Sequence, residues 1–285
     1  LNKMKIAILT DSSAVIDADA AANLDIKILA LPLLLGQKVY YEGQDLRDGE
    51  LFDLVNDSKE TLNIASVSRK TLAQQMQTLA DAGYTDVICI YLANGINALD
   101  ENLRTYAKAE ARALNVHLFD SHTTGLAQAK LVRQAAKLVK SGEDVAQILA
   151  KLSVMRDKTQ TIVIDDIRNL RKTGYVSNGT PVVGNALLHL KTLLEFTDDG
   201  KLAVLDTSVR MKKAYYKVLE QINSSGQEVT DLMLMCDEAS AETANKWLQK
   251  FQTDLPETKL EITRLKPSIR AHVGEKSLLV SWIYA

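Results

Sequence analysis

A short apolar run that stops abruptly in a polar cluster constrains the fold more than any other stretch of the sequence. Residues 6–9 read Ile-Ala-Ile-Leu, and residues 10–13, Thr-Asp-Ser-Ser, follow directly. The apolar run predicts a strand buried on both faces, as in a parallel sheet covered by helices. The carboxyl end of such a strand lies at the crevice where open α/β sheets bind ligands. The polar cluster is therefore either part of a ligand site or the cap of the following helix, and both interpretations stay open.

Strand-like and helix-like segments alternate up to about residue 158, which is typical of parallel βαβ units. The predicted strands cover 6–9, 26–35, 38–41, 87–92 and 116–119, and the predicted helices cover 14–24, 49–58, 71–82, 100–113, 126–140 and 145–156. Pro32 predicts an edge or a kink in the second strand, because proline cannot donate to a sheet ladder. Residues 61–68 read as a polar loop. Small polar residues also follow two later strands, at 93–97 and 120–124, so three polar strand ends would meet at one sheet edge.

The pattern changes from about residue 161. The predicted strands there cover 161–164, 194–197, 202–206, 231–236, 260–265 and 278–284, and the predicted helices cover 165–172, 211–223 and 239–253. Short turns join neighbouring strands as often as helices do, which predicts a mixed or antiparallel sheet with helices on one face. A chain of 285 residues is long enough for two cores. We therefore predict an α/β protein with a mostly parallel N-terminal domain, helices on both faces, over residues 1–158, and a mixed α/β sandwich over 159–285.

Composition and missing motifs exclude several function classes. A net charge of -2, with 25% charged residues, gives no sign of a nucleic-acid surface. No run of eighteen apolar residues predicts a membrane span, and no cleavage-like pattern predicts a signal peptide. Cys89 and Cys236 lie in or after apolar runs and look like buried core residues, which fits a reducing cytoplasm.

Familiar catalytic and cofactor motifs are also missing. The sequence has neither the glycine-rich dinucleotide fingerprint nor a P-loop, and its four histidines lack metal-ligand spacing. A strand ending in Asp11 could host an aspartyl-phosphate nucleophile, but Ser13 stands where such phosphatases carry a second aspartate. We therefore expect no cofactor, no bound metal and little catalysis by this chain alone.

Six separated motifs resemble, in the same order, those of the DegV family of bacterial fatty-acid-binding proteins. They are TDSS at 10–13; Asp120-Ser121 followed by Gly125; 165–177, which resembles DDLxYLxKGGRIS; 187–194, which resembles LLxIKPIL; Val209-Arg210, which resembles K-V-R; and 271–274, which resembles H-x-G. Each motif alone is weak evidence for this family. Six motifs in the same order over nearly the full length are specific evidence for it.

The resemblance implies two α/β domains with one long-chain fatty acid held between them. It implies a cytoplasmic carrier and not an enzyme, because a separate kinase subunit would phosphorylate the carboxylate of the bound acid. Burying an acyl chain is worth about 0.8 kcal/mol per methylene, so a closed apolar tunnel is expected. The implied partners are the fatty acid and the kinase subunit, with no nucleic acid and at most transient contact with a membrane surface.

The head-group motifs depart from the family pattern. The usual T-S-x-P-S reads Ala-Ser-Val-Ser-Arg at 65–69, and the usual S-S-x-L-S-G-T reads Ala-Asn-Gly-Ile-Asn-Ala-Leu at 93–99. Tyr175 stands where the family has the arginine of G-R-I-S. A reworked carboxylate site or a changed ligand is therefore expected.

The resemblance and these departures together give the candidate ligand-binding residues. We predict that Ser66, Asn94 and Asn97 lie near the carboxylate, since amide side chains can replace hydroxyl donors. Ser121 and His272 are predicted as further fatty-acid-binding residues. The competing interpretation is that Ser66, Asn94 and Asn97 are ordinary turn and loop residues.

Arg210 and His272 are predicted to face a phosphoryl-donating partner near the carboxylate exit. A guanidinium suits phosphate through its rigid fork of donors. Arg210 also opens a basic run with Lys212, Lys213 and Lys217, which would equally be the solvated face of a helix.

A second interpretation is a substrate-binding subunit like those of dihydroxyacetone kinases, to which the family fold is related. In those proteins a histidine bonds covalently to a small ketone, and His272 or His122 would be the candidate here. A lone histidine is more often structural. A short polar cavity would favour this enzyme subunit, whereas a long apolar tunnel would favour the carrier.

Overall fold

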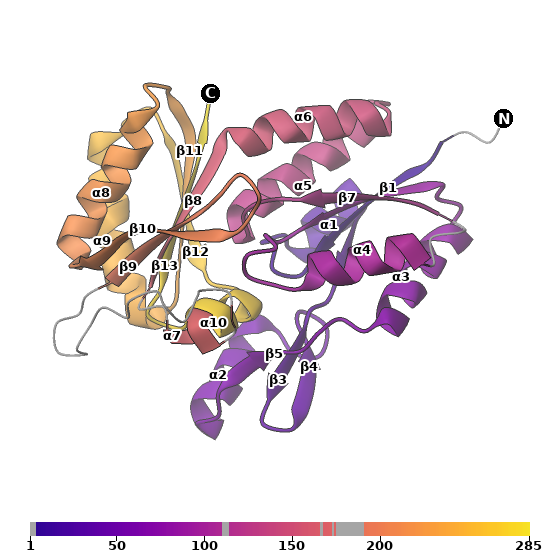
Figure 1. Ribbon diagram of the computed structural model, residues 1–285, viewed down its shortest axis with the longest axis horizontal. Coiled ribbons are helices and arrows are strands. Elements are labelled where there is room, and N and C mark those ends of the chain that lie inside the picture. Colours follow the sequence, from indigo (N-terminus) through magenta and orange to yellow (C-terminus); the bar gives the residue numbers. More distant parts are fainter. Residues whose placement is uncertain (1–3, 110–113, 166–167, 173, 175–190) are drawn as a thin grey trace.

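The computed structural model describes residues 4–109, 114–165, 168–172, 174 and 191–285 (Figure 1). The N-terminal part contains β1 (Ile6–Asp11), α1 (Ala18–Leu24), β2 (Ile26–Leu29), β3 (Pro32–Leu35), β4 (Lys38–Tyr41), α2 (Asp48–Ser58), β5 (Leu62–Ile64), α3 (Arg69–Asp81), β6 (Asp86–Tyr91), α4 (Leu99–Ala109), β7 (Asn115–Asp120), α5 (Gly125–Lys140) and α6 (Val145–Asp157). The C-terminal part contains β8 (Thr159–Asp165), α7 (Arg168–Lys172), β9 (Lys191–Phe196), β10 (Leu202–Val209), α8 (Met211–Ser224), β11 (Val229–Cys236), α9 (Glu238–Asp254), β12 (Lys259–Arg264), α10 (Pro267–Val273) and β13 (Leu278–Tyr284).

The N-terminal part is built on a parallel sheet with the strand order β2-β1-β6-β7. Every residue of β1 and of β6 is buried, because helices cover both faces of the sheet. Helices α5 and α6 lie on one side of the sheet, and α3 and α4 on the other (Figure 1). Ile8 and Ile88 pack on the side of α5 and α6, while Leu9 and Cys89 pack on the side of α3 and α4. This arrangement confirms the predicted parallel sheet.

The C-terminal part is built on a six-stranded sheet with the order β10-β9-β8-β13-β11-β12. All its neighbouring strands are antiparallel except β11 and β12, so the sheet is mixed, as predicted. Helices α8 and α9 cover one face (Figure 1). Tyr215, Trp247 and Phe251 pack together on that face. The predicted α/β class with a parallel and a mixed sheet is therefore confirmed. The boundary at residue 158 stays a prediction; Lys158 directly follows α6.

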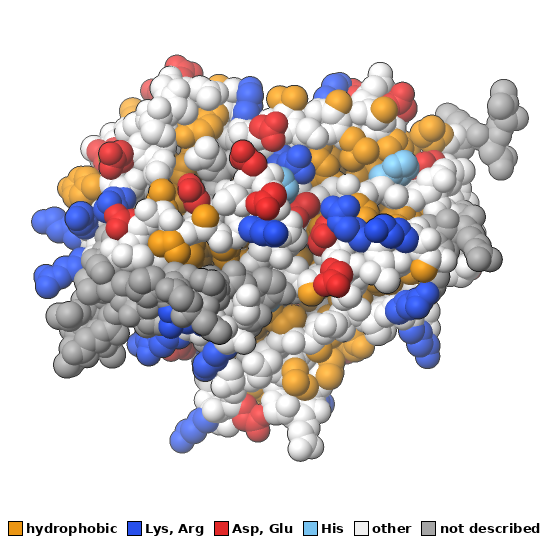
Figure 2. All heavy atoms as spheres, in the orientation of Figure 1, with side chains coloured by type: hydrophobic (Ala, Val, Ile, Leu, Met, Phe, Trp, Pro, Cys, Tyr) orange, Lys and Arg blue, Asp and Glu red, His pale blue; other side chains and the backbone are white. Residues whose placement is uncertain are grey.

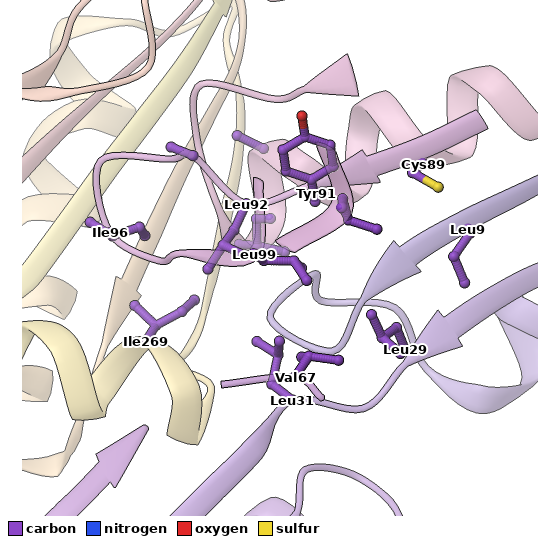
Figure 3. Packing of buried hydrophobic residues seen from close by; sticks show 14 of the residues in the cluster. Leu9, Leu29, Leu31, Val67, Cys89, Tyr91, Leu92, Ile96, Leu99 and Ile269 are labelled. Carbon is purple, nitrogen blue, oxygen red and sulfur yellow. The ribbon is translucent and has the colours of Figure 1, made fainter. Parts of the chain in front are cut away.

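One apolar cluster connects the two large sheets. It contains Leu9 of β1 together with Val163 and Leu279 from the face of the C-terminal sheet opposite α8 and α9. Ile96, from the loop after β6, and Ile269 of α10 belong to the same cluster (Figure 3). We call this cluster the shared core.

Three elements differ from the prediction. The predicted strand 26–35 is wrong as one strand: β2 joins the parallel sheet, and Pro32 begins β3 of a third sheet with the order β4-β3-β5. The predicted strand at 38–41 is confirmed as β4, which pairs antiparallel with β3. β5 lies inside the predicted polar loop 61–68, and α10 was not predicted.

Gly95 lies where the loop 93–98 touches the turn between β9 and β10. Its N–H donates to the carbonyl of Gly200 at 2.9 Å. A Cβ at residue 95 would lie 2.6 Å from that carbonyl oxygen and 2.7 Å from the Cα of Lys201, and both are backbone atoms. We therefore expect Gly95→Ala to lower the free energy of unfolding by about 2 kcal/mol, as overpacking does elsewhere. Urea unfolding followed by circular dichroism measures this loss.

Gly49→Ala is the matched control. Nothing lies within 4 Å of a Cβ built at Gly49, which is in α2. Alanine is favoured over glycine inside a helix by about 1 kcal/mol, so this variant should be neutral or stabilised. Equal unfolding free energies for the two variants would contradict the steric argument.

Candidate functional site

Asp11, at the end of β1, is a structural residue. Its Oδ1 accepts a hydrogen bond from the N–H of Ser13 at 2.9 Å, and its Oδ2 accepts from the N–H of Leu92 at 2.8 Å and from Nε2 of Gln128 at 2.9 Å. Burial raises the pKa of Asp11, and the donated hydrogen bonds lower it. The carboxylate ties β1 to the start of the loop 93–98 and to α5. The helix-cap interpretation of the cluster 10–13 is wrong, because Asp17 caps α1.

Glu42 is a second buried carboxyl group, and it connects three parts of the fold. Its Oε2 accepts a hydrogen bond from the Ser12 hydroxyl at 2.6 Å, and its Oε1 accepts from the N–H of Ser268 at 2.9 Å. Ser12 follows β1, Glu42 follows β4 of the small sheet, and Ser268 lies in α10. Burial raises the pKa of Glu42 to about 7, against the opposing charge of Lys266. The position of α10 therefore depends on a carboxyl group far from it in sequence.

Asn97 and His272 meet in the interior. Nδ2 of Asn97 lies 3.4 Å from Nε2 of His272, and Oδ1 of Asn97 accepts a hydrogen bond from the N–H of Leu99 at 2.9 Å. His272 is only 1% exposed, and burial lowers its pKa to about 3. The imidazole is therefore neutral at pH 7, and its Nε2 can accept from the asparagine amide. Ile96 and Leu99 on one side and Ile269 on the other belong to the shared core (Figure 3).

Ser66 lies in the loop between β5 and α3, and it is exposed. The next residue, Val67, is buried in the shared core with Leu31 (Figure 3). The carbonyl of Val67 accepts a hydrogen bond from Nδ2 of Asn102 in α4 at 3.4 Å. The Ser66 loop therefore packs against the helix that begins just after Asn97.

Asn94 and Ser121 bond to other groups. Nδ2 of Asn94 donates to Oδ2 of Asp120 and to the carbonyl of Asp199, both at 2.7 Å. The hydroxyl of Ser121 donates to the carbonyl of Thr123 at 3.0 Å. Asn94 thus joins the β7 end to the turn between β9 and β10, and Ser121 shapes the turn that leads into α5. The five predicted ligand-binding residues therefore form two groups. Ser66, Asn97 and His272 lie near the start of α4, whereas Asn94 and Ser121 lie at the end of β7.

Comparison with known protein families decides the family of this chain. The profile described as "Uncharacterised protein, DegV family" matches residues 5–285. The chain belongs to the DegV family. The predicted family is thereby confirmed.

Relatives and solved structures of DegV proteins agree with this assignment. A DegV domain-containing protein of Streptococcus pyogenes serotype M3 is 28% identical over 281 residues, which cover 96% of this chain and 97% of the relative. The crystal structure of the fatty acid binding DegV family protein SAG1342 from Streptococcus agalactiae is 26% identical, covers 99% of each chain and superposes with a TM-score of 0.85. The structure of DegV, a fatty acid binding protein from Bacillus subtilis, is 23% identical, covers 99% of this chain and 100% of its own, and has a TM-score of 0.82.

Arg210 of this DegV chain lies at the same end of the C-terminal sheet as α10. It is exposed and directly precedes α8. Val209, the residue before it in β10, pairs with Lys191 of β9. Nζ of Lys191 donates to the carbonyl of Lys276 at 3.4 Å. Lys217 of the predicted basic run forms an ion pair with Asp206 and is not a free surface charge.

Some predictions fall on residues outside the described part of the DegV chain. They concern Tyr175 and part of each of the motifs at 165–177 and 187–194. Cys89 and Cys236 are free and buried, as predicted, and burial raises the pKa of each thiol. Within the described residues, no three His, Cys, Asp or Glu side chains gather as metal ligands. No described helix is both long and apolar enough to span a membrane.

Proposed function

We propose that this DegV chain binds one long-chain fatty acid between its two domains and presents the carboxylate to a separate kinase subunit. The observation that carries the proposal is the shared core between the two sheets, with the buried neutral pair Asn97 and His272 among its residues. Apolar surface favours an acyl chain by about 0.8 kcal/mol per methylene. The fatty acid binding of the S. agalactiae relative supports the same ligand class.

Asn97 and His272 are the proposed carboxylate-binding residues, with Ser66 as a further donor. A buried carboxylate needs hydrogen-bond donors. The amide nitrogen of Asn97 carries two N–H bonds, so it can bond to His272 and still donate to a carboxylate. Asn94 and Ser121 would act indirectly by holding their loops, because their side chains already bond to Asp120 and Thr123.

Lipid analysis tests the proposal. Gentle denaturation of cell-purified protein and mass spectrometry of the extract should find about one fatty acid per chain. Asn97→Asp should weaken fatty-acid binding at least about tenfold, because it replaces a donor with a like charge. The new carboxylate would keep an acceptor for the N–H of Leu99, so the first residue of helix α4 would keep this hydrogen bond.

Asn245→Asp on the exposed side of α9 is the matched control and should bind as the unmodified chain does. The proposal would be overturned if the purified protein contained no stoichiometric lipid and also took up no added fatty acid. Equal affinity of the Asn97→Asp variant and the unmodified protein would remove Asn97 from the site.

Arg210 is the proposed contact for the phosphoryl-donating partner. Because Arg210 is exposed, Arg210→Ala should leave lipid content unchanged. It should slow acyl-phosphate formation with the cognate kinase subunit at least about tenfold, since a charge-assisted bond to phosphate is lost. Arg47→Ala, also exposed, is the control. Loss of lipid from the Arg210→Ala variant would show that Arg210 holds the ligand. An unaltered rate of acyl-phosphate formation would show that Arg210 is only a surface charge.

The dihydroxyacetone-kinase-like alternative has one structural feature in its favour. His122 lines a polar cavity of about 330 Å³. Burial, with the charge of Arg156, lowers the pKa of His122 to about 4, so its imidazole is neutral. A covalent adduct at His122 after incubation with dihydroxyacetone, detected by mass spectrometry, would support this alternative.

A further inference from the structure

The cavity beside His122 arises where β9 separates from β8. The pairing of these strands runs from Asp165 to Ile162, so residues 159–161 of β8 have no partner residue in β9. On its other side this stretch still pairs with β13. The end of α6 and the turn between β9 and β10 enclose the remaining space, whose volume is about 330 Å³. This size falls in the range of small-molecule sites.

The cavity lining is acidic. Asp157, Glu195 and Asp198 line it, and Arg156 is its one cation among the described residues. None of the three carboxylates makes a hydrogen bond or an ion pair within the described part of the chain. Acidic side chains gather on this face of the molecule, between α6 and the β9–β10 hairpin (Figure 2). The lining therefore favours a positively charged ligand over an anion.

Two buried donors also lie in the lining. Nε of Arg156 and Nε1 of Trp282 are inaccessible, and neither has a hydrogen-bond partner among the described residues. Arg156 is fixed in place, because its Nη1 donates to the carbonyl of Asp120 at 3.0 Å and its guanidinium stacks over Phe119 at 4.7 Å. Buried donors without partners are costly, and an acceptor oxygen would satisfy them.

We propose that this cavity binds a small organic ammonium compound that also carries a hydroxyl or carbonyl oxygen. The carboxylates of Asp157, Glu195 and Asp198 would balance the ammonium charge, and the ring of Phe196 would add a cation–π contact. The oxygen of the ligand would accept from Arg156 or Trp282. A metal ion fits less well, since no group of three metal-ligating side chains occurs in the described residues. The proposal is independent of fatty-acid binding.

Choline, ethanolamine and glycine betaine are suitable probes, with glycerol and inorganic phosphate as the uncharged and anionic comparisons. The chain has 2 tryptophans, so Trp247→Phe leaves Trp282 as the only indole, and its fluorescence reports binding at the cavity. We expect saturable binding of at least one ammonium probe, with a Kd below about 1 mM. Ligand-observed NMR on the unmodified protein gives the same answer if Trp247→Phe does not fold.

The double variant Glu195→Gln/Asp198→Asn should weaken probe binding at least about tenfold, because two of the three carboxylates are lost. Glu101→Gln, on the exposed side of α4, is the control and should change nothing. Fatty-acid content should stay the same in all variants. Failure of every ammonium probe to saturate, preference for glycerol or phosphate, or full affinity in the double variant would each overturn the proposal. A dihydroxyacetone adduct at His122 would assign the cavity to the carbonyl alternative instead.

Discussion

Asp11→Ala is expected to lower the free energy of unfolding by about 3–5 kcal/mol, because three buried neutral donors would lose the acceptor that they share. The variant would leave the backbone N–H of Leu92 and of Ser13 and the Nε2 group of Gln128 without their acceptor. Each unsatisfied buried donor costs about 1–3 kcal/mol. Urea unfolding followed by tryptophan fluorescence measures the loss.

Asp53→Ala on the exposed side of α2 is the control for Asp11→Ala. Alanine is a better helix former than aspartate, so this variant should lie within about 0.5 kcal/mol of the unmodified protein. An Asp11→Ala variant as stable as this control would show that the network contributes little.

Glu42 should make stability fall as the pH rises towards neutrality. Its pKa of about 7 in the folded chain lies above its ordinary value of 4.5, because of burial. Between these two values the folded chain binds more protons than the unfolded chain, so stability decreases as pH rises. The stabilising contribution is complete below pH 4.5 and lost above about pH 7, and the change amounts to about 3 kcal/mol.

Glu42→Gln should remove this pH dependence. A glutamine can still accept from the N–H of Ser268, and the Ser12 hydroxyl can accept from its amide. The stability difference between Glu42→Gln and the unmodified protein should therefore be larger at pH 8 than at pH 5, in favour of the variant. Urea midpoints over this range measure it, with the exposed Glu60→Gln as the control. Parallel pH curves for all three proteins would contradict the assignment of Glu42.

The large sheets could be predicted because their strands are continuous apolar runs. Residues 26–35 were wrongly predicted as one strand, because the sequence stays apolar while the chain passes from the parallel sheet to the small sheet. The physical cause lies outside the run: the N–H of Leu31 donates to the Ser12 hydroxyl at 2.9 Å instead of to a strand. β5 has 3 residues and α10 has 7, which is too short for a clear periodicity.

The candidate site depends on contacts that no local pattern contains. Asn97 and His272 are 175 positions apart and were paired only through the family resemblance. Asp11 was noticed as part of a polar strand end, but its burial was not predicted. Glu42 lies in a polar segment where exposure is the ordinary expectation, and only the fold shows that it is enclosed.

The position of β13 also bears on how the chain folds. β13 lies between β8 and β11, so it joins the two halves of the six-stranded sheet. The residues that meet there are distant in sequence; Thr161 and Ser281, whose hydroxyls bond at 2.8 Å, are 120 positions apart. Long loops must close before such contacts form, which slows folding. The hairpin of β9 and β10, in contrast, pairs Phe196 with the nearby Leu202. We therefore expect the pairing of β13 with β8 to form later in folding than this local hairpin.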